Sequence, residues 1–114
     1  QCKLKLIRYE SYSNTGMSKV VESDDNNNTI DANSLDSIIS FNENVVLIKI
    51  DAEGSEPKVL EGALNIIKLN NPVIICEAAT NNEFKEINNI LLPLGYQLPT
   101  RRFNATPTYV WINK

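Results

Sequence analysis

Two short, almost entirely apolar segments stand out in the hydrophobic pattern of the chain, at residues 45–50 and 72–78. Only Lys49 interrupts the first segment. Such runs are typical of strands that are covered on both faces, as in a parallel sheet. The first run leads directly into Asp51, and the second contains Glu77 near its end. The pattern therefore predicts two parallel strands with acidic side chains at their carboxyl ends.

Apolar residues at helical spacing follow each of these predicted strands. The sequence Gly-Ser-Glu-Pro at 54–57 is a helix start, because a proline in the first turn lacks an N–H that would be unpaired there anyway. Residues 70–72 (Asn-Asn-Pro) end this first helix, whose expected inner face is Val59, Leu60, Ala63, Leu64 and Ile67. A second helix is predicted over 82–92, with an inner face of Phe84, Ile87, Ile90 and Leu91.

The first forty residues predict smaller elements. Residues 3–9 alternate between apolar and polar side chains as a strand does, and residues 17–21 form a second short strand. The acidic, Asn-rich stretch at 22–29 is expected to be an exposed loop. A short helix is predicted over 35–40, capped by Asn33 or Ser34, with Leu35, Ile38 and Ile39 on its inner face.

The end of the chain predicts an antiparallel hairpin formed by residues 95–102 and 106–113. The order strand, helix, strand, helix and hairpin is an α/β pattern with a parallel sheet and an antiparallel edge. In this arrangement Tyr109 and Trp111 are core residues rather than a substrate platform. Arg101 and Arg102 are interpreted as the solvated end of the hairpin.

Composition narrows the possible functions. The 114 residues have a net charge of −3, so the chain has no electrostatic footprint for nucleic acid or for an anionic membrane surface. No apolar run approaches the ~20 residues needed to span a bilayer. The two cysteines give no disulfide framework, and we expect a cytoplasmic protein. The chain contains no histidine, which leaves carboxylates, tyrosine, lysine and cysteine for proton transfer.

Four acids are candidates for such chemistry: Asp51, Glu53 and Glu56 after the first strand, and Glu77 at the end of the second. Ligands bind outside the carboxyl ends of strands in open α/β sheets. Clustered carboxylates also raise the pKa of one member, which suits a general base. The alternatives are that Glu56 only complements the helix dipole and that Asp51 and Glu53 form a solvated turn.

Four segments together resemble the FkbM family of S-adenosylmethionine-dependent methyltransferases. They are Ser-Leu-Asp at 34–36, Ile-Lys-Ile-Asp-Ala-Glu-Gly-Ser-Glu at 48–56, Val-Leu-Glu-Gly-Ala at 59–63, and Pro-Val-Ile-Ile-Cys-Glu at 72–77. Order and spacing both agree with the family pattern. The resemblance covers roughly residues 3–80, and the Asp-x-Glu-Gly-x-Glu core carries most of its specificity.

The resemblance implies a partial Rossmann-like class I methyltransferase sheet. Residues 3–9 would be its third strand, 45–50 its fourth and 72–78 its fifth, with the C-terminal hairpin as the last two. The family's glycine-rich cofactor loop is not found, so residues 1–114 are expected to be the C-terminal half of one domain, inactive alone. We then expect an open edge on the strand at 45–50, which could pair with another chain.

The implied function is S-adenosylmethionine-dependent methylation of a small-molecule or glycan hydroxyl, such as that of a sugar or a polyketide-type product. By this resemblance Asp51 and Glu53 are the catalytic acids, and Glu56 and Glu77 bind substrate. No cofactor-binding residue and no metal is assigned. One alternative is a non-catalytic fragment or binding module that pairs through its open sheet edge. Another is a divalent-cation site without catalysis, formed by the same carboxylates.

Overall fold

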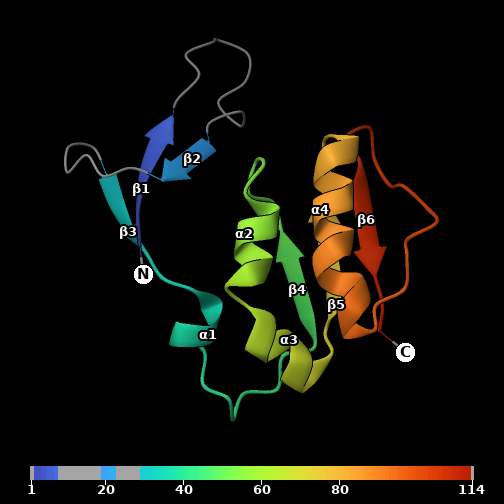
Figure 1. The fold of residues 1–114 in the computed structure, drawn as a ribbon, viewed down its shortest axis with the longest axis horizontal. Helices are drawn as coiled ribbons and strands as arrows, with labels where there is room; N and C mark the ends of the chain where they lie inside the picture. Colours follow the sequence, from blue (N-terminus) through green and yellow to red (C-terminus); the bar gives the residue numbers. More distant parts are fainter. Residues whose placement is uncertain (1, 8–18, 23–28, 114) are drawn as a thin grey trace.

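The computed structural model describes residues 2–7, 19–22 and 29–113, and Figure 1 shows their arrangement. The fold is α/β, as the sequence predicts, with two separate three-stranded sheets of order β2-β1-β3 and β4-β5-β6. The second sheet is mixed and consists of β4 (Leu47–Ile50), β5 (Val73–Glu77) and β6 (Thr108–Trp111). β4 and β5 are parallel, whereas β6 is antiparallel to β5.

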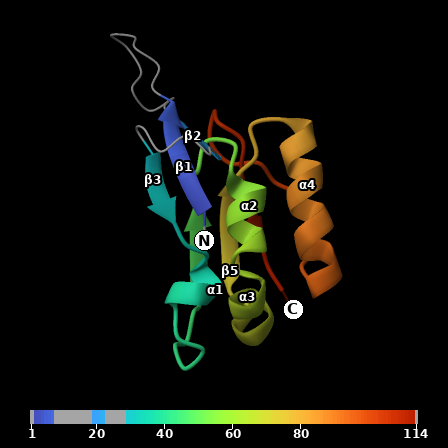
Figure 2. The same cartoon turned by 60° about the vertical axis from the view of Figure 1, so that its left-hand side comes forward.

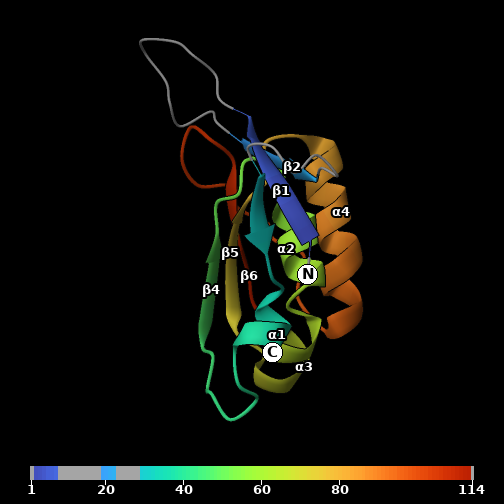
Figure 3. The same ribbon diagram turned by 90° about the vertical axis from the view of Figure 1, so that its left-hand side faces the viewer.

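The helices that follow β4 in the chain lie on one face of the β4-β5-β6 sheet, as Figure 3 shows. They are α2 (Glu56–Glu61), α3 (Leu64–Asn70), α4 (Asn81–Leu91) and the 3-10 turn η2 (Leu92–Leu94). Alternate residues of β4 are buried toward these helices, namely Ile48 and Ile50, whereas Leu47 and Lys49 are exposed. The expectation that this strand is covered on both faces is therefore wrong within the described residues.

The helix that follows β4 is divided in two, where the sequence predicted one. Gly62 and Ala63 interrupt it, and the Ala63 cap position provides no side-chain hydrogen bond to α3. Asp36, in the short helix α1 (Leu35–Ile38), supplies the missing cap from outside, because its carboxylate accepts the N–H groups of Asn65 and Ile66, both at 3.0 Å. Acceptors for these otherwise unpaired N–H groups fix the start of α3.

Gly62 is also where α1 approaches the helix pair. The Asp36 N–H donates to the Gly62 carbonyl at 2.9 Å, and a Cβ at position 62 would lie 3.0 Å from the Cβ of Ser34. A side chain at this position would therefore have to displace Ser34 by a few tenths of an ångström. Ser34 caps α1 as the sequence predicts, but Ile38 is 63% exposed and does not belong to the inner face. Leu35 and Ile39 do pack against the core.

The core lies between the sheet and the helices. It contains most of the predicted inner residues of both long helical segments, but not Leu64. Five of them are fully buried: Leu60, Ala63, Ile67, Ile87 and Leu91. Trp111 of β6 is also fully buried, and its Nε1–H donates to the side-chain oxygen of Asn88 at 2.8 Å. This bond explains a buried amide on α4, since an unpaired polar group there would be costly.

The N-terminal strands form their own antiparallel sheet, which Figure 2 shows beside α2 and α1. It consists of β1 (Cys2–Ile7), β2 (Lys19–Glu22) and β3 (Thr29–Ala32). β1 pairs with both neighbours, so it is not a third strand of the β4-β5-β6 sheet and does not lack a partner. β3 was not predicted, and the expected loop lies largely at 23–28, outside the described residues.

The predicted C-terminal hairpin is only half formed. Residues 95–102 make no strand, and two isolated bridges remain, between Tyr96 and Asn113 and between Phe103 and Thr108. β6 instead pairs along its length with β5. β4 therefore lies at the sheet edge, as expected, and its pairing with another chain stays a prediction. In the part of the chain that the structure describes, no helix has the length and apolar character needed to cross a membrane.

Candidate functional site

A tight turn connects β4 to α2 and contains three of the four candidate acids. The Ser55 N–H donates to the Ala52 carbonyl at 3.2 Å, and the two residues between them have positive φ, 48° at Glu53 and 98° at Gly54. Two such residues are the signature of a type I′ turn. Glycine adopts this conformation freely, whereas a glutamate there is strained. The turn therefore holds the backbone of the exposed Glu53 in a conformation that glutamate rarely adopts.

The buried Glu56 side chain stabilises this turn by accepting two of its backbone N–H groups. Its side chain is 1% exposed, and its two carboxylate oxygens accept the N–H of Ala52 at 2.7 Å and that of Gly54 at 2.9 Å. The residue also occupies the first turn of α2, where the helix dipole favours a negative charge. These contacts favour the structural alternative for Glu56. A substrate-binding role for it stays a prediction.

The other three candidate acids are brought together at the carboxyl ends of the two parallel strands. One carboxylate oxygen each of Asp51, Glu53 and Glu77 lies within 4.8 Å of the other two. Asp51 and Glu53 are exposed and Glu77 is half-buried. The sequence predicted this meeting because the ends of adjacent parallel strands lie at the same edge of the sheet. The roles of the three acids stay predictions.

The environment of Glu77 alters its titration. Its pKa rises from 4.5 to about 7, first because burial disfavours the charged form and then because its side chain is hydrogen-bonded to Asp51. The negative charges of Asp51, Glu53 and Glu56 raise this pKa further. The cluster therefore contains a carboxyl group that exchanges a proton near neutral pH, the property a general base requires.

Cys76, next to Glu77 on β5, is the other group that could carry chemistry. Its side chain is fully buried, as predicted. Burial, reinforced by the charges of Glu56 and other nearby acids, raises the pKa of its thiol far above the usual range. Because the thiolate is the reactive form, Cys76 is a packing residue and not a nucleophile.

Glu83 is a further acid near this turn, and the sequence reasoning missed it. Its Oε2 accepts the Ala79 N–H at 2.8 Å, and its Oε1 lies 3.5 Å from where a Cβ on Gly54 would stand. The Glu83 N–H in turn donates to Thr80 Oγ1 at 3.2 Å. The signal was present as Thr-x-x-Glu at 80–83, which is the sequence of a helix capping box.

A parallel strand pair that ends in a carboxylate cluster places the chain among α/β proteins whose sites lie at the carboxyl ends of their strands. The model of one family, the methyltransferase FkbM domain, matches residues 5–98. The chain therefore belongs to the FkbM methyltransferase domain family, which confirms the resemblance in the motifs. No curated protein and no solved structure was found that matches the chain.

Proposed function

We propose that this chain forms one wall of the active site of an S-adenosylmethionine-dependent O-methyltransferase, and that Asp51 and Glu77 act in it as a coupled proton acceptor. The observation that carries the proposal is the meeting of the Asp51 and Glu77 carboxylates within 4.8 Å at the ends of two parallel strands, where burial and the neighbouring acids raise the pKa of Glu77 to about 7. A methyltransferase family domain supports the reaction class. The acceptor is a hydroxyl of a small molecule or glycan.

The pair works through the number of protons that it holds. Below about pH 7 Glu77 holds its own proton and cannot take another from a substrate. When both groups are ionised, the pair accepts the hydroxyl proton as the acceptor oxygen becomes the nucleophile. Glu53, whose carboxylate oxygen lies within 4.8 Å of both, orients the acceptor through its remaining hydroxyl groups.

S-adenosylmethionine supplies an electrophilic methyl group on a positively charged sulfur when it is bound. The residues at the ends of β4 and β5 fit this group by charge, because three carboxylates converge there. Gly54 adds an exposed backbone position next to the cluster, with φ of 98° and Glu83 Oε1 beside it. We assign no residue to the adenosine or to the methionine carboxylate.

The unit β4-α2-α3-β5 supports the further proposal that the sheet is part of a Rossmann-like methyltransferase domain. Its two strands are parallel and its helices cover one face, which is the repeating unit of such sheets. The antiparallel β6 against β5 agrees with an antiparallel edge.

The test is transfer of a labelled methyl group from S-adenosylmethionine to a panel of hydroxylated acceptors by the native protein. Asp51→Asn and Glu77→Gln are each expected to lower kcat by about 100-fold or more, the usual contribution of a general base. Glu61→Gln is the matched control, because Glu61 is an exposed acid on α2 outside the cluster. Full activity of both cluster variants would show that the pair is not the proton acceptor.

The same three carboxylates support a second candidate function, a divalent-cation site. Oxygen ligands within 4.8 Å of one another suit Mg²⁺ or Ca²⁺. Calorimetric titration of the native protein with MgCl₂ and CaCl₂ separates the two proposals. The cation site is favoured if Asp51→Asn abolishes cation binding but keeps full methyl transfer. It is ruled out if the native protein binds neither Mg²⁺ nor Ca²⁺.

A further inference from the structure

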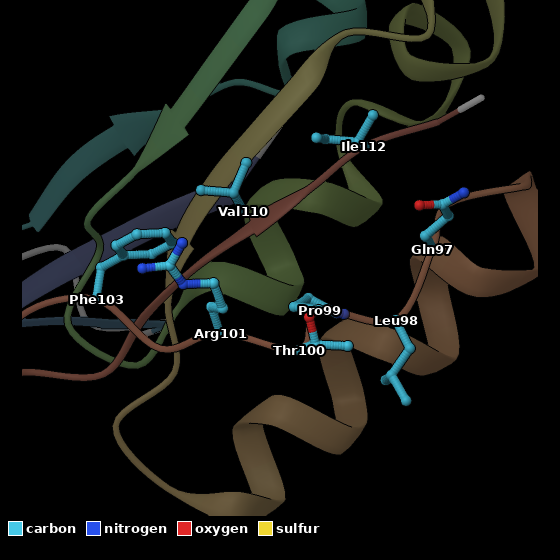
Figure 4. Close-up of a pocket in the computed structure, with 8 residues that line it drawn as sticks. All are labelled: Gln97, Leu98, Pro99, Thr100, Arg101, Phe103, Val110 and Ile112. Carbon is cyan, nitrogen blue, oxygen red and sulfur yellow. The ribbon is translucent and has the colours of Figure 1, made fainter.

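A hollow of about 210 Å³ opens between the loop at 97–103 and strand β6. Figure 4 shows the side chains that line it, and we call it the C-terminal pocket. Val110 of β6 and Ile112, just after this strand, contribute apolar side chains, whereas Gln97 and Arg101 contribute polar groups from the loop. Much of this pocket lies beyond residue 98, where the family match ends.

The pocket lies beside the acid cluster because of the strand register. Glu77 of β5 pairs with Thr108 of β6, and Thr108 forms a bridge with Phe103, which lines the pocket. Two backbone hydrogen bonds fix that bridge: the Phe103 N–H donates to the Thr108 carbonyl at 2.8 Å, and the Thr108 N–H donates to the Phe103 carbonyl at 3.0 Å. Two strand spacings, about 10 Å, therefore separate Glu77 from Phe103 along the sheet.

Glu77 and the pocket also share a face of the sheet. Val110 pairs with Ile75, and Ile75 lies two residues before Glu77 on β5. Alternate residues of a strand point to the same side, so Val110, Ile75 and Glu77 all lie on one face. The intervening Cys76 and the neighbouring Trp111 are fully buried toward the helices. The pocket and the acid cluster are thus on the face that the helices leave uncovered.

Arg101 gives the pocket a positively charged group in a defined position. Its guanidinium carbon lies 5.3 Å from the centre of the Phe103 ring, and Figure 4 shows the two side chains stacked. Stacking on an aromatic ring orients the planar guanidinium and leaves its N–H groups available for an oxyanion. The chain as a whole has a net charge of −3, so an anion needs such a local cation in order to bind.

We propose that the C-terminal pocket binds the anionic end of the acceptor, through Arg101, while the acceptor's hydroxyl reaches the Asp51–Glu77 pair. This proposal rests on the function proposed above. The occupant is a saccharide that reaches from the pocket to the strand ends, where Phe103 and Glu77 are two strand spacings, about 10 Å, apart. Its carboxylate or phosphate pairs with the guanidinium, and its C–H faces pack on Phe103 and Val110.

The experiment is an NMR titration of the full chain with three probes: a glucuronic-acid-containing disaccharide, a phosphorylated disaccharide and the neutral disaccharide. We expect the Arg101 side-chain N–H and the Val110 methyl signals to shift when a charged probe is added. Neither signal should shift with the neutral disaccharide. A response to the carboxylate probe alone or to the phosphate probe alone identifies the anion. Equal shifts with the neutral probe, or none with any probe, overturn the proposal.

Three variants sharpen the result. Arg101→Gln is expected to weaken binding of the charged probe about ten-fold or more, as loss of a charge-assisted hydrogen bond does. Arg102→Gln is the matched control, because Arg102 is an exposed neighbour that does not line the pocket. Equal losses in both variants would contradict a specific site. Glu61→Gln, at an exposed acid outside both the pocket and the cluster, should leave probe binding within two-fold of the native value. Failure of the proton-acceptor proposal is recognised separately by its methyl-transfer assay.

Discussion

One carboxylate oxygen of Glu77 lies within 4.8 Å of one of Asp51, although the two residues end different strands. Because β4 and β5 are parallel and Ile50 is in register with Cys76, the residues that follow these two positions are brought to the same edge. The pair is held without histidine, which the chain does not contain. Proton exchange near neutral pH is therefore achieved by burial and by a second acid.

The first prediction concerns stability against pH. The pKa of Glu77 is raised from 4.5 to about 7 on folding, so the native state holds more protons than the unfolded state between these values. The Glu77 contribution to the free energy of unfolding is therefore greatest below pH 4.5 and decreases as pH rises toward 7. In thermal unfolding, the Tm of Glu77→Gln should therefore increase relative to that of the native protein as pH rises from 4.5 to about 7. A constant difference in Tm from pH 4 to pH 8 would contradict the raised pKa.

The second prediction concerns the buried Glu56. Glu56→Ala removes the acceptor of the Ala52 and Gly54 N–H groups and leaves a cavity, so it should cost about 2–4 kcal/mol in the free energy of unfolding. Glu56→Gln keeps one oxygen and should cost less, about 1–2 kcal/mol. Urea denaturation measures both, with Glu61→Gln as the exposed control. A cost below about 0.5 kcal/mol for Glu56→Ala would show that Glu56 does not stabilise the fold.

The third prediction concerns the cap that α1 provides to α3. Asp36→Ala should destabilise the protein by about 1–2 kcal/mol, because the N–H groups of Asn65 and Ile66 lose their acceptor. Amide hydrogen exchange should report the loss at these two positions before it reports global unfolding. Asp36→Asn, which keeps one oxygen, should show a smaller effect. Unchanged exchange at both amides in Asp36→Ala would mean that α3 needs no cap from α1.

Much of the β4 to α4 region could be predicted from the sequence, because its signals are local. Continuous apolar runs defined both parallel strands, and helical spacing identified most of the apolar residues that the structure buries on α2, α3 and α4, but not Ile66. The site followed from the same signals, since strand ends determine where Asp51 and Glu77 meet. The division between α2 and α3 could not be predicted, because it depends on the contact of Gly62 with Ser34.

The elements that were wrong depend on partners distant in the sequence. The alternation at residues 3–9 predicted a strand, but not that β1 would pair with β2 and β3 in a separate sheet. Residues 97–103 form a loop around a pocket instead of a strand, because β6 pairs with β5 and only Phe103 remains bridged to it. Arg101 is exposed, as predicted, but it stacks on the Phe103 ring beside the pocket and does not end a hairpin.

The dependence of methyl transfer on pH tests the proposed proton acceptor most directly. For the native protein, kcat with an acceptor that it methylates should rise with pH and level off. The apparent pKa of this rise should be about 7, the value for Glu77. In Asp51→Asn, loss of the hydrogen bond and the charge should move any residual profile to lower pH. A kcat that does not change between pH 5 and pH 9, or an identical profile in Glu77→Gln, would contradict the account.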